Sequence, residues 1–370
     1  MTLQDFEKRI ADFFGTRYAI ATGSGRIALK IALQSLNIPE GDVVVPNLTC
    51  PIVPQTIIST GLTPLLVDMN RDLSLNQDIL ENKANSSTKA LLTSYLYGCP
   101  TDDMDRLVDI SRDKNLWIIE DAAQAFGAKI MGKYAGSHGD IGVLSFAKVF
   151  FPLYRGGAII TNNEELANRA YLIRRETQTE SNTLNTMRYV LKRLRGFIPK
   201  DLKKARLRSI NVDTPAQGSS GLYKAYEPSS PSHFQGLTDV EVAVGIRTLN
   251  NLEHLIASRR EITKSMYSAI SNRDDLHLQP LHPYREEYVY SRIPVLVESS
   301  SLHKWMASFL ERGEFIGMAY LPLSNNDLIR HKCTLLDNYS VSEDLSANLL
   351  PLPVNRNVMK ILKRKACVCD

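Results

Sequence analysis

The 370-residue sequence is poor in cysteine and has almost no excess charge. Its five cysteines, at positions 50, 99, 333, 367 and 369, are odd in number and lack zinc-finger spacing. This excludes a disulfide-dense domain, and we predict reduced thiols, no metal site and a cytoplasmic location. The formal net charge of +4 argues against nucleic-acid binding as the main activity.

Long apolar runs are missing as well. Residues 1–8 do not resemble a signal segment. The longest stretch without a charged residue, 43–67, contains four prolines. Because proline interrupts helices, this stretch predicts a strand, a loop, a helix and a second strand rather than a membrane span.

Short apolar segments alternate with helical patterns through the first 160 residues. The predicted strands are 18–21, 43–45, 64–67, 90–96, 116–119, 142–145 and 157–160, and the predicted helices include 3–14, 26–36 and 104–114. This alternation indicates an α/β sheet covered on both faces. In such sheets the carboxyl ends of the strands open into a crevice, where Tyr97, Asp121 and Ser145 would lie. That placement predicts an enzyme.

The second half of the chain changes in character. Residues 188–208 hold nine Lys or Arg and one acidic residue, with apolar residues at helical spacing. This pattern predicts a basic amphipathic helix. The simplest interpretation is a solvated helix whose apolar stripe packs against the domain. Weak contact with a membrane surface and steering of anionic nucleotide-sugars are the alternatives. One long helix over 239–267 is expected to lead into a C-terminal domain with strands at 288–297 and 317–321.

Three short motifs can each be interpreted as functional or as purely structural. The turn Thr22–Arg26, between a strand and a helix, suits a phosphate or is only a tight turn. Asp121 could hold a pyridinium nitrogen protonated, or cap the following helix. Lys148 could form a Schiff base with an aldehyde, or be a solvated surface lysine. The apolar run 149–154 favours an enclosed lysine over a solvated one.

Several ordered motifs together resemble one family. They are Gly23-Ser-Gly25-Arg26-Ile-Ala-Leu29, Tyr95-Leu-Tyr97-Gly98, Glu120-Asp121-Ala-Ala-Gln124-Ala-Phe-Gly127, Gly139-Asp140 to Ser145-Phe146, and Asn348-Leu-Leu-Pro351-Leu-Pro353. The chain resembles the DegT/DnrJ family of pyridoxal phosphate (PLP)-dependent sugar aminotransferases, of the aspartate aminotransferase (type I) fold. The resemblance implies a three-layer αβα large domain with a mostly parallel sheet, over residues 1–250 with a basic helical insertion at about 177–234, and a smaller α+β domain over 251–370.

The resemblance also implies roles for single residues. Lys148 would bond covalently to the cofactor and shuttle protons, and Asp121 would pair with the pyridine nitrogen. Gln124 would lie near the phenolic oxygen. The phosphate would be held by the N–H groups of Gly25 and Arg26 and by the Ser145 side chain. Cys50 falls where the family often has an aromatic residue stacked on the ring.

The sequence departs from the family at three positions. Phe150 stands at the usual lysine position, Phe234 stands near the place of an asparagine that reaches the neighbouring subunit's phosphate, and Arg155 replaces a small or acidic residue. We predict a homodimer that moves an amino group from glutamate to a nucleotide-linked keto-sugar, in surface glycan or secondary-metabolite biosynthesis. The alternatives are an inactive scaffold or regulator, and a PLP-dependent sugar dehydratase. The dehydratase would need a histidine in place of the lysine, and the chain has none near 148.

Overall fold

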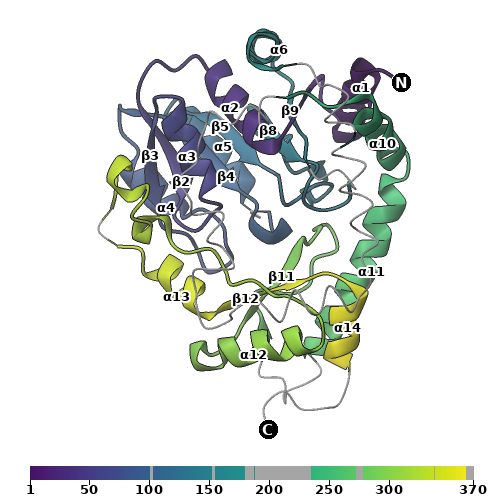
Figure 1. Cartoon of the computed structure of the whole chain (residues 1–370). Helices are drawn as coiled ribbons and strands as arrows, with labels where there is room; N and C mark the ends of the chain where they lie inside the picture. Colours follow the sequence, from purple (N-terminus) through teal and green to yellow (C-terminus); the bar gives the residue numbers. More distant parts are fainter. Residues whose placement is uncertain are drawn as a thin grey trace.

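A seven-stranded sheet forms the centre of the larger part of the molecule (Figure 1). The computed structural model describes residues 1–100, 103–151, 155–179, 187, 235–271, 278–336 and 338–363. The strand order is β1-β9-β8-β5-β4-β2-β3, and β9 is antiparallel to both of its neighbours while the others run parallel. The bounds are β1 (Tyr18–Thr22), β2 (Asp42–Pro46), β3 (Thr63–Val67), β4 (Thr88–Ser94), β5 (Trp117–Asp121), β8 (Ile141–Ser145) and β9 (Gly157–Thr161).

Helices cover both faces of this sheet, because its strands carry apolar side chains on alternate sides. One face packs against α1 (Leu3–Phe14), α5 (Met104–Asp113) and α10 (Asp239–Leu249), and the other against α2 (Gly25–Ser35), α3 (Ile52–Ser59) and α6 (Glu164–Thr177). The short helix α4 (Gln77–Lys83) and the two-stranded ribbon of β6 (Lys129–Ile130) and β7 (Lys133–Tyr134) complete this part. The result is a three-layer αβα arrangement, as the sequence predicts.

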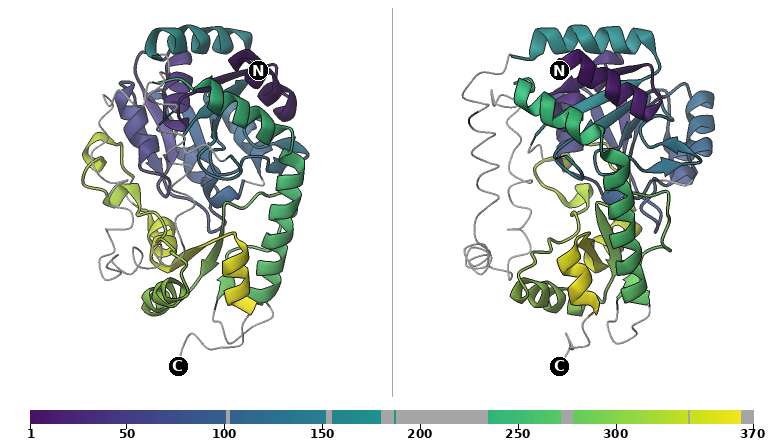
Figure 2. Two further views of the ribbon diagram at one scale, coloured as in Figure 1. Left: turned by 45° about the vertical axis from the view of Figure 1, so that its right-hand side comes forward. Right: turned by 90° about the vertical axis from the view of Figure 1, so that its right-hand side faces the viewer.

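The smaller part is built on a three-stranded antiparallel sheet with its own apolar core. Its strands are β10 (Gln279–Pro280), β11 (Arg292–Leu296) and β12 (Leu349–Pro353), and its helices are α12 (Ser299–Glu311), α13 (Ser340–Asn348) and α14 (Arg356–Lys363). The long helix α11 (Leu252–Ser271) runs down one side of the molecule from the larger part to the smaller one (Figures 1 and 2).

Two expectations about the second half of the chain are wrong. The single helix expected over 239–267 is two helices, α10 and α11, because the chain turns at Asn250 and Asn251. In this turn the Asn251 N–H donates to the Thr248 carbonyl. No strand forms at 317–321, although Ala319 is buried there. The predicted basic helix at 188–208 lies outside the described residues. Within the described part of the chain, no helix has both the length and the apolar content to cross a membrane.

Candidate active site

The first turn of α2 lies directly against the end of β8. Ser24 caps the helix by accepting the Ile27 N–H at 3.2 Å, and Gly25 and Arg26 are its first two residues. A Cβ atom on Gly25 would lie 3.1 Å from Ser145 Cβ and 3.3 Å from Ser145 Oγ. The N–H groups of a first helical turn point out of the helix end and carry a partial positive charge. The start of α2 beside Ser145 therefore suits an anion.

The backbones of β8, β9 and the first turn of α2 lie unusually close together. Gly157, the first residue of β9, is so close that a Cβ on it would lie 2.6 Å from Gly25 Cα. Gly156 donates its N–H to the Gly23 carbonyl at 2.9 Å. Three glycines thus let β8, β9 and the start of α2 approach one another where side chains would separate them.

Asp121 ends β5, next to β8 in the sheet. Its carboxylate accepts the Ala123 N–H at 3.1 Å in a local turn, and residues 122–127 form no helix for it to cap. Burial raises the pKa of Asp121 to about 6, and the Ala123 hydrogen bond and the charge of Lys148 oppose that rise. Asp121 is thus a part-buried acid within the electrostatic reach of Lys148.

Lys148 follows β8 in a bend and is exposed, which corrects the expectation that the apolar run encloses it. The reason is that Phe151, rather than the lysine, turns into the core, where its ring packs on Phe126 and Phe146. The charge of Lys148 nevertheless acts on this site, because it opposes the burial that raises the pKa of Cys50 and of Asp121. The structure therefore brings Lys148, Asp121 and Cys50 together.

Gln124 also lies at this site. Its Oε1 atom accepts the Tyr97 N–H and the Ser291 hydroxyl, both at 3.3 Å. Among the described residues its Nε2 atom makes no hydrogen bond. The amide nitrogen is therefore available to an acceptor on a ligand.

Two tyrosines near Cys50 escaped the sequence reasoning as ligand-facing groups. The Tyr320 side chain interacts with the Cys50 thiol and lowers its pKa, against the larger effect of burial, and the Tyr320 ring stacks on Tyr97 at 6.3 Å and 7°. Tyr97 was noted only for its place at a strand end. Tyr320 comes from the smaller part of the molecule, some 270 residues after Cys50, and no local motif marks it. Both rings are thus aromatic neighbours of the site that Cys50 belongs to.

Glu120, beside Asp121, faces the opposite way and is fully buried. Its oxygens accept three N–H groups of the loop before β8, from Gly136 at 2.7 Å, His138 at 2.7 Å and Gly139 at 2.6 Å. The Tyr95 hydroxyl donates to it at 2.5 Å. Glu120 thus supports the loop that leads into β8, while Asp121 faces the cleft.

Arg155, one of the departures from the family pattern, is part of the framework. Its guanidinium binds both carboxylate oxygens of Glu241 and the carbonyls of Gln235 and Gly236. Glu241 is buried at the start of α10. These bonds hold residues 235–241 next to Gly23, where a Cβ would clash with the Gln235 carbonyl.

Curated proteins and solved structures resemble this chain. The chain is 39% identical over 170 residues to GDP-perosamine synthase of Escherichia coli O157:H7, which is 45% of this chain and 46% of that protein. The matched part thus spans about half the length of such curated relatives. Among the described residues, no three His, Cys, Asp or Glu side chains gather as a metal site.

Two solved structures show the same fold. A putative sugar aminotransferase from Streptococcus pneumoniae in its PMP form has a TM-score of 0.76 and 21% identity, covering 97% of this chain and 90% of that one. The GDP-4-keto-6-deoxy-D-mannose-3-dehydratase of E. coli with bound hydrated PLP has a TM-score of 0.73 and 21% identity, with the same two coverages. An aminotransferase and a dehydratase fit equally well, so these likenesses define the fold alone.

The residues present fit pyridoxal phosphate. The cradle at Gly25 and Ser145, which a Cβ would fill, suits the phosphate, and the part-buried Asp121 suits a basic ring nitrogen. The sequence profile of the DegT/DnrJ/EryC1/StrS aminotransferase family matches residues 1–361. The resemblance seen in the motifs is thereby confirmed, and the chain belongs to this family, whose cofactor is pyridoxal phosphate.

Proposed function

We propose that this chain is a PLP-dependent aminotransferase that moves an amino group from glutamate to a keto-sugar carried on a nucleotide. The observation that carries the proposal is the placement of Lys148, whose charge acts on Asp121 beside the anion cradle of Gly25 and Ser145. The likeness to GDP-perosamine synthase supports a nucleotide-sugar as substrate. Such an enzyme would serve surface glycan or secondary-metabolite biosynthesis.

Each residue has a separate task in this proposal. Ser145 and the N–H groups of Gly25 and Arg26 bind the phosphate, and the carboxylate of Asp121 holds a proton on the ring nitrogen. When bound, the protonated ring supplies an electron sink for the bond broken at the substrate's α-carbon. The Lys148 amine takes the proton from the substrate's α-carbon. The Gln124 amide donates a hydrogen bond to the phenolic oxygen.

Two alternatives predict different chemistry. A dehydratase would need a histidine where Lys148 stands, and His138, the histidine nearest in sequence, uses its backbone N–H to bind Glu120. An inactive scaffold would bind partners without moving an amino group. The shifted lysine motivates that alternative, and the electrostatic reach of Lys148 to Asp121 weighs against it.

A single experiment separates these possibilities. Purified protein is loaded with PLP, and its absorption spectrum is recorded before and after glutamate is added. We expect the visible band to give way to the pyridoxamine form in the wild type, and no such conversion in Lys148→Ala. A wild type that binds PLP but never converts would support the scaffold, and one that takes up no PLP would refute the enzyme.

The remaining assignments belong to the same proposal. We place the boundary between the cofactor domain and the small domain near residue 250, because α11 starts at Leu252. A cytoplasmic homodimer is proposed from the resemblance to the family. Sedimentation of the purified chain tests the dimer.

A further inference from the structure

The amide of Gln124 has a fixed orientation, and the cause lies in the small domain. A backbone N–H can only donate, so the atom of Gln124 that faces the Tyr97 N–H at 3.3 Å must be Oε1. The Ser291 hydroxyl donates to the same oxygen at 3.3 Å. With two donors on Oε1, the Nε2 atom must point the other way, where the described residues offer it no acceptor.

Ser291 is itself held from two sides. Its N–H donates to the Tyr97 carbonyl at 2.8 Å, so one residue binds both Tyr97 and Gln124. Arg259, on the long helix α11, donates to the Tyr290 carbonyl at 2.6 Å and to the Ser291 carbonyl at 2.9 Å. Burial lowers the pKa of Arg259 to about 10, which leaves it charged at neutral pH. Residues 290 and 291 are therefore fixed to a rigid element.

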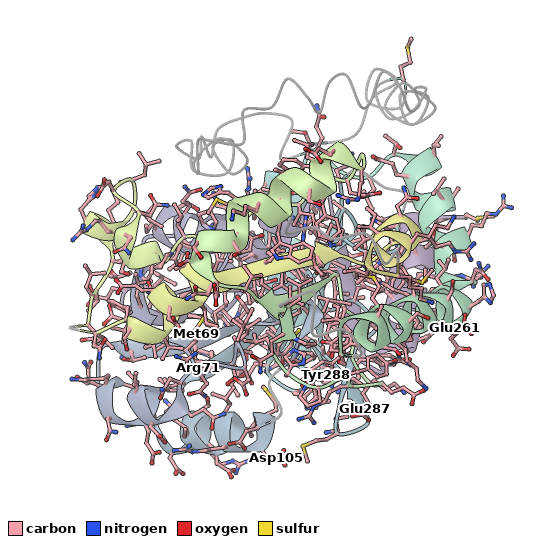
Figure 3. All side chains as sticks on the ribbon, turned by 90° about the horizontal axis from the view of Figure 1, so that it is seen from below. Met69, Arg71, Asp105, Glu261, Glu287 and Tyr288 are labelled. Atoms are coloured by element: carbon pink, nitrogen blue, oxygen red, sulfur yellow. The ribbon has the colours of Figure 1, made fainter. Side chains whose placement is uncertain are left out.

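The backbone at the other side of this contact is unusual. Tyr97 has φ of 59° and ψ of 9°, a left-handed conformation that a tyrosine rarely adopts. The next residue, Gly98, has no room for a Cβ, which would lie 2.1 Å from the Val289 carbonyl. The segment before β11, where Figure 3 labels Glu287 and Tyr288, thus packs against the turn Leu96–Gly98 that follows β4. The left-handed turn directs the Tyr97 N–H to Gln124 and its carbonyl to Ser291.

We propose that Ser291 is a positioning residue: it orients Gln124 so that the amide N–H₂ group faces the phenolic oxygen of the cofactor. The inference rests on the proposed function, because it assumes that PLP occupies the cleft. It couples the cofactor site to the small domain through a side chain that does not itself touch the reacting atoms. A hydrogen bond to the phenolic oxygen stabilises its anionic form, so the state of this amide is visible in the cofactor's spectrum.

The test compares two substitutions at Ser291. Ser291→Ala removes the donor, whereas Ser291→Thr keeps a hydroxyl, and Ser300→Ala, on an exposed turn of α12, is the matched control. For each PLP-loaded variant the visible absorption is titrated against pH. We expect the titration midpoint of Ser291→Ala to rise by about half a pH unit or more, with Ser291→Thr and Ser300→Ala at the wild-type midpoint.

One further measurement separates a folding defect from a change at the cofactor. The melting temperature of each variant without cofactor shows whether folding is intact, and we expect it to change little in Ser291→Ala. A wild-type titration curve for a folded, PLP-loaded Ser291→Ala would overturn this inference and leave the proposed function in place. A wild type that binds no PLP would overturn the proposed function and the inference with it. A Ser291→Thr variant that behaves as Ser291→Ala would also overturn the role given to the hydroxyl.

Discussion

Arg155 and Glu241, 86 residues apart in the sequence, form a bidentate ion pair in which Nε lies 2.9 Å from Oε1 and Nη2 lies 3.0 Å from Oε2. The Glu241 side chain is 2% exposed and the Arg155 side chain 22%. A buried pair of this kind is costly to break, because removing one partner leaves the other charge without compensation. The pair thus joins the end of the β8–β9 connection to the start of α10.

Loss of the arginine alone is therefore expected to destabilise the protein. We expect Arg155→Met to lower the free energy of unfolding by about 3 kcal/mol, measured by urea denaturation. The double variant Arg155→Met/Glu241→Gln removes the stranded charge and should recover a large part of that loss. If the double variant is no more stable than Arg155→Met, the charge of Glu241 is not the cause.

The cradle beside Ser145 gives a prediction about cofactor affinity. A methyl group in Gly25→Ala would crowd Ser145 at 3.1–3.3 Å and occupy the space assigned to the phosphate. We expect PLP to bind at least about tenfold more weakly, or about 1.4 kcal/mol, in a fluorescence titration. Gly317→Ala is the control, because its nearest atom beyond its chain neighbours is 3.9 Å away in Phe315. Equal affinity in both variants would contradict the assignment of the phosphate site.

The identity of the reactive lysine can be read from a chemical label. Borohydride reduction of the PLP-loaded protein fixes the cofactor to its lysine, and we expect the label in the peptide that contains Lys148. Lys148→Ala should lose amino transfer by about 10²–10⁴-fold, since it removes the group that moves the proton. Lys129→Ala serves as the control, because that amine lies over the Tyr134 ring at 4.8 Å. A label on any other lysine would refute the assignment.

Asp121 should make the cofactor-free protein sensitive to pH. Its pKa is about 6 in the folded protein and about 3.9 in an unfolded chain, so folding favours the protonated form. The stability contributed by this group is therefore lost as pH rises from about 4 to about 6. Asp121→Asn removes that loss and keeps an oxygen for the Ala123 N–H. We expect the variant to be more stable than the wild type by about 1–2 kcal/mol at pH 8 and about equal at pH 4.

The same substitution should weaken amino transfer, because an amide cannot hold the ring nitrogen's proton by charge.

Thermal unfolding of the cofactor-free wild type and Asp121→Asn at pH 4 and pH 8 measures the predicted difference in stability. If the difference between wild type and Asp121→Asn is the same at pH 4 and pH 8, the raised pKa of Asp121 is not supported.

The hydrogen bonds of Glu120 predict a loss of stability when its carboxylate is replaced. Glu120→Gln would place an amide N–H₂ group against at least one of the buried donors at Gly136, His138 and Gly139. We expect a loss of about 2–4 kcal/mol in the free energy of unfolding, because buried donors would lose their acceptor. Glu311→Gln, on the exposed end of α12, should change stability by less than about 0.5 kcal/mol. A Glu120→Gln variant as stable as the wild type would show that the loop does not depend on this carboxylate.

Much of the fold follows from local pattern. The first helix was expected over 3–14 and is α1, Leu3–Phe14, because Phe6, Ile10 and Phe14 recur at helical spacing and Thr2 caps the start. The order of strands and helices places Asp121 and Ser145 at the carboxyl ends of neighbouring strands, where a parallel sheet opens. By contrast, periodicity could not reveal the break at Asn250, since the apolar pattern continues through α10 into α11.

The sequence by itself determined the αβα layers, the small-residue turn before α2 and the acid at the end of β5, because each depends on residues close together in the chain. Only the tertiary structure decided that Arg155 pairs with Glu241, that Tyr320 covers Cys50 and that Ser291 holds Gln124. Such contacts join residues far apart in sequence, which local patterns do not pair. The first lies within the larger part, and the other two join the larger part to the smaller one. Packing also decided that Lys148 is exposed, because Phe151 fills the apolar space beside Phe126 and Phe146.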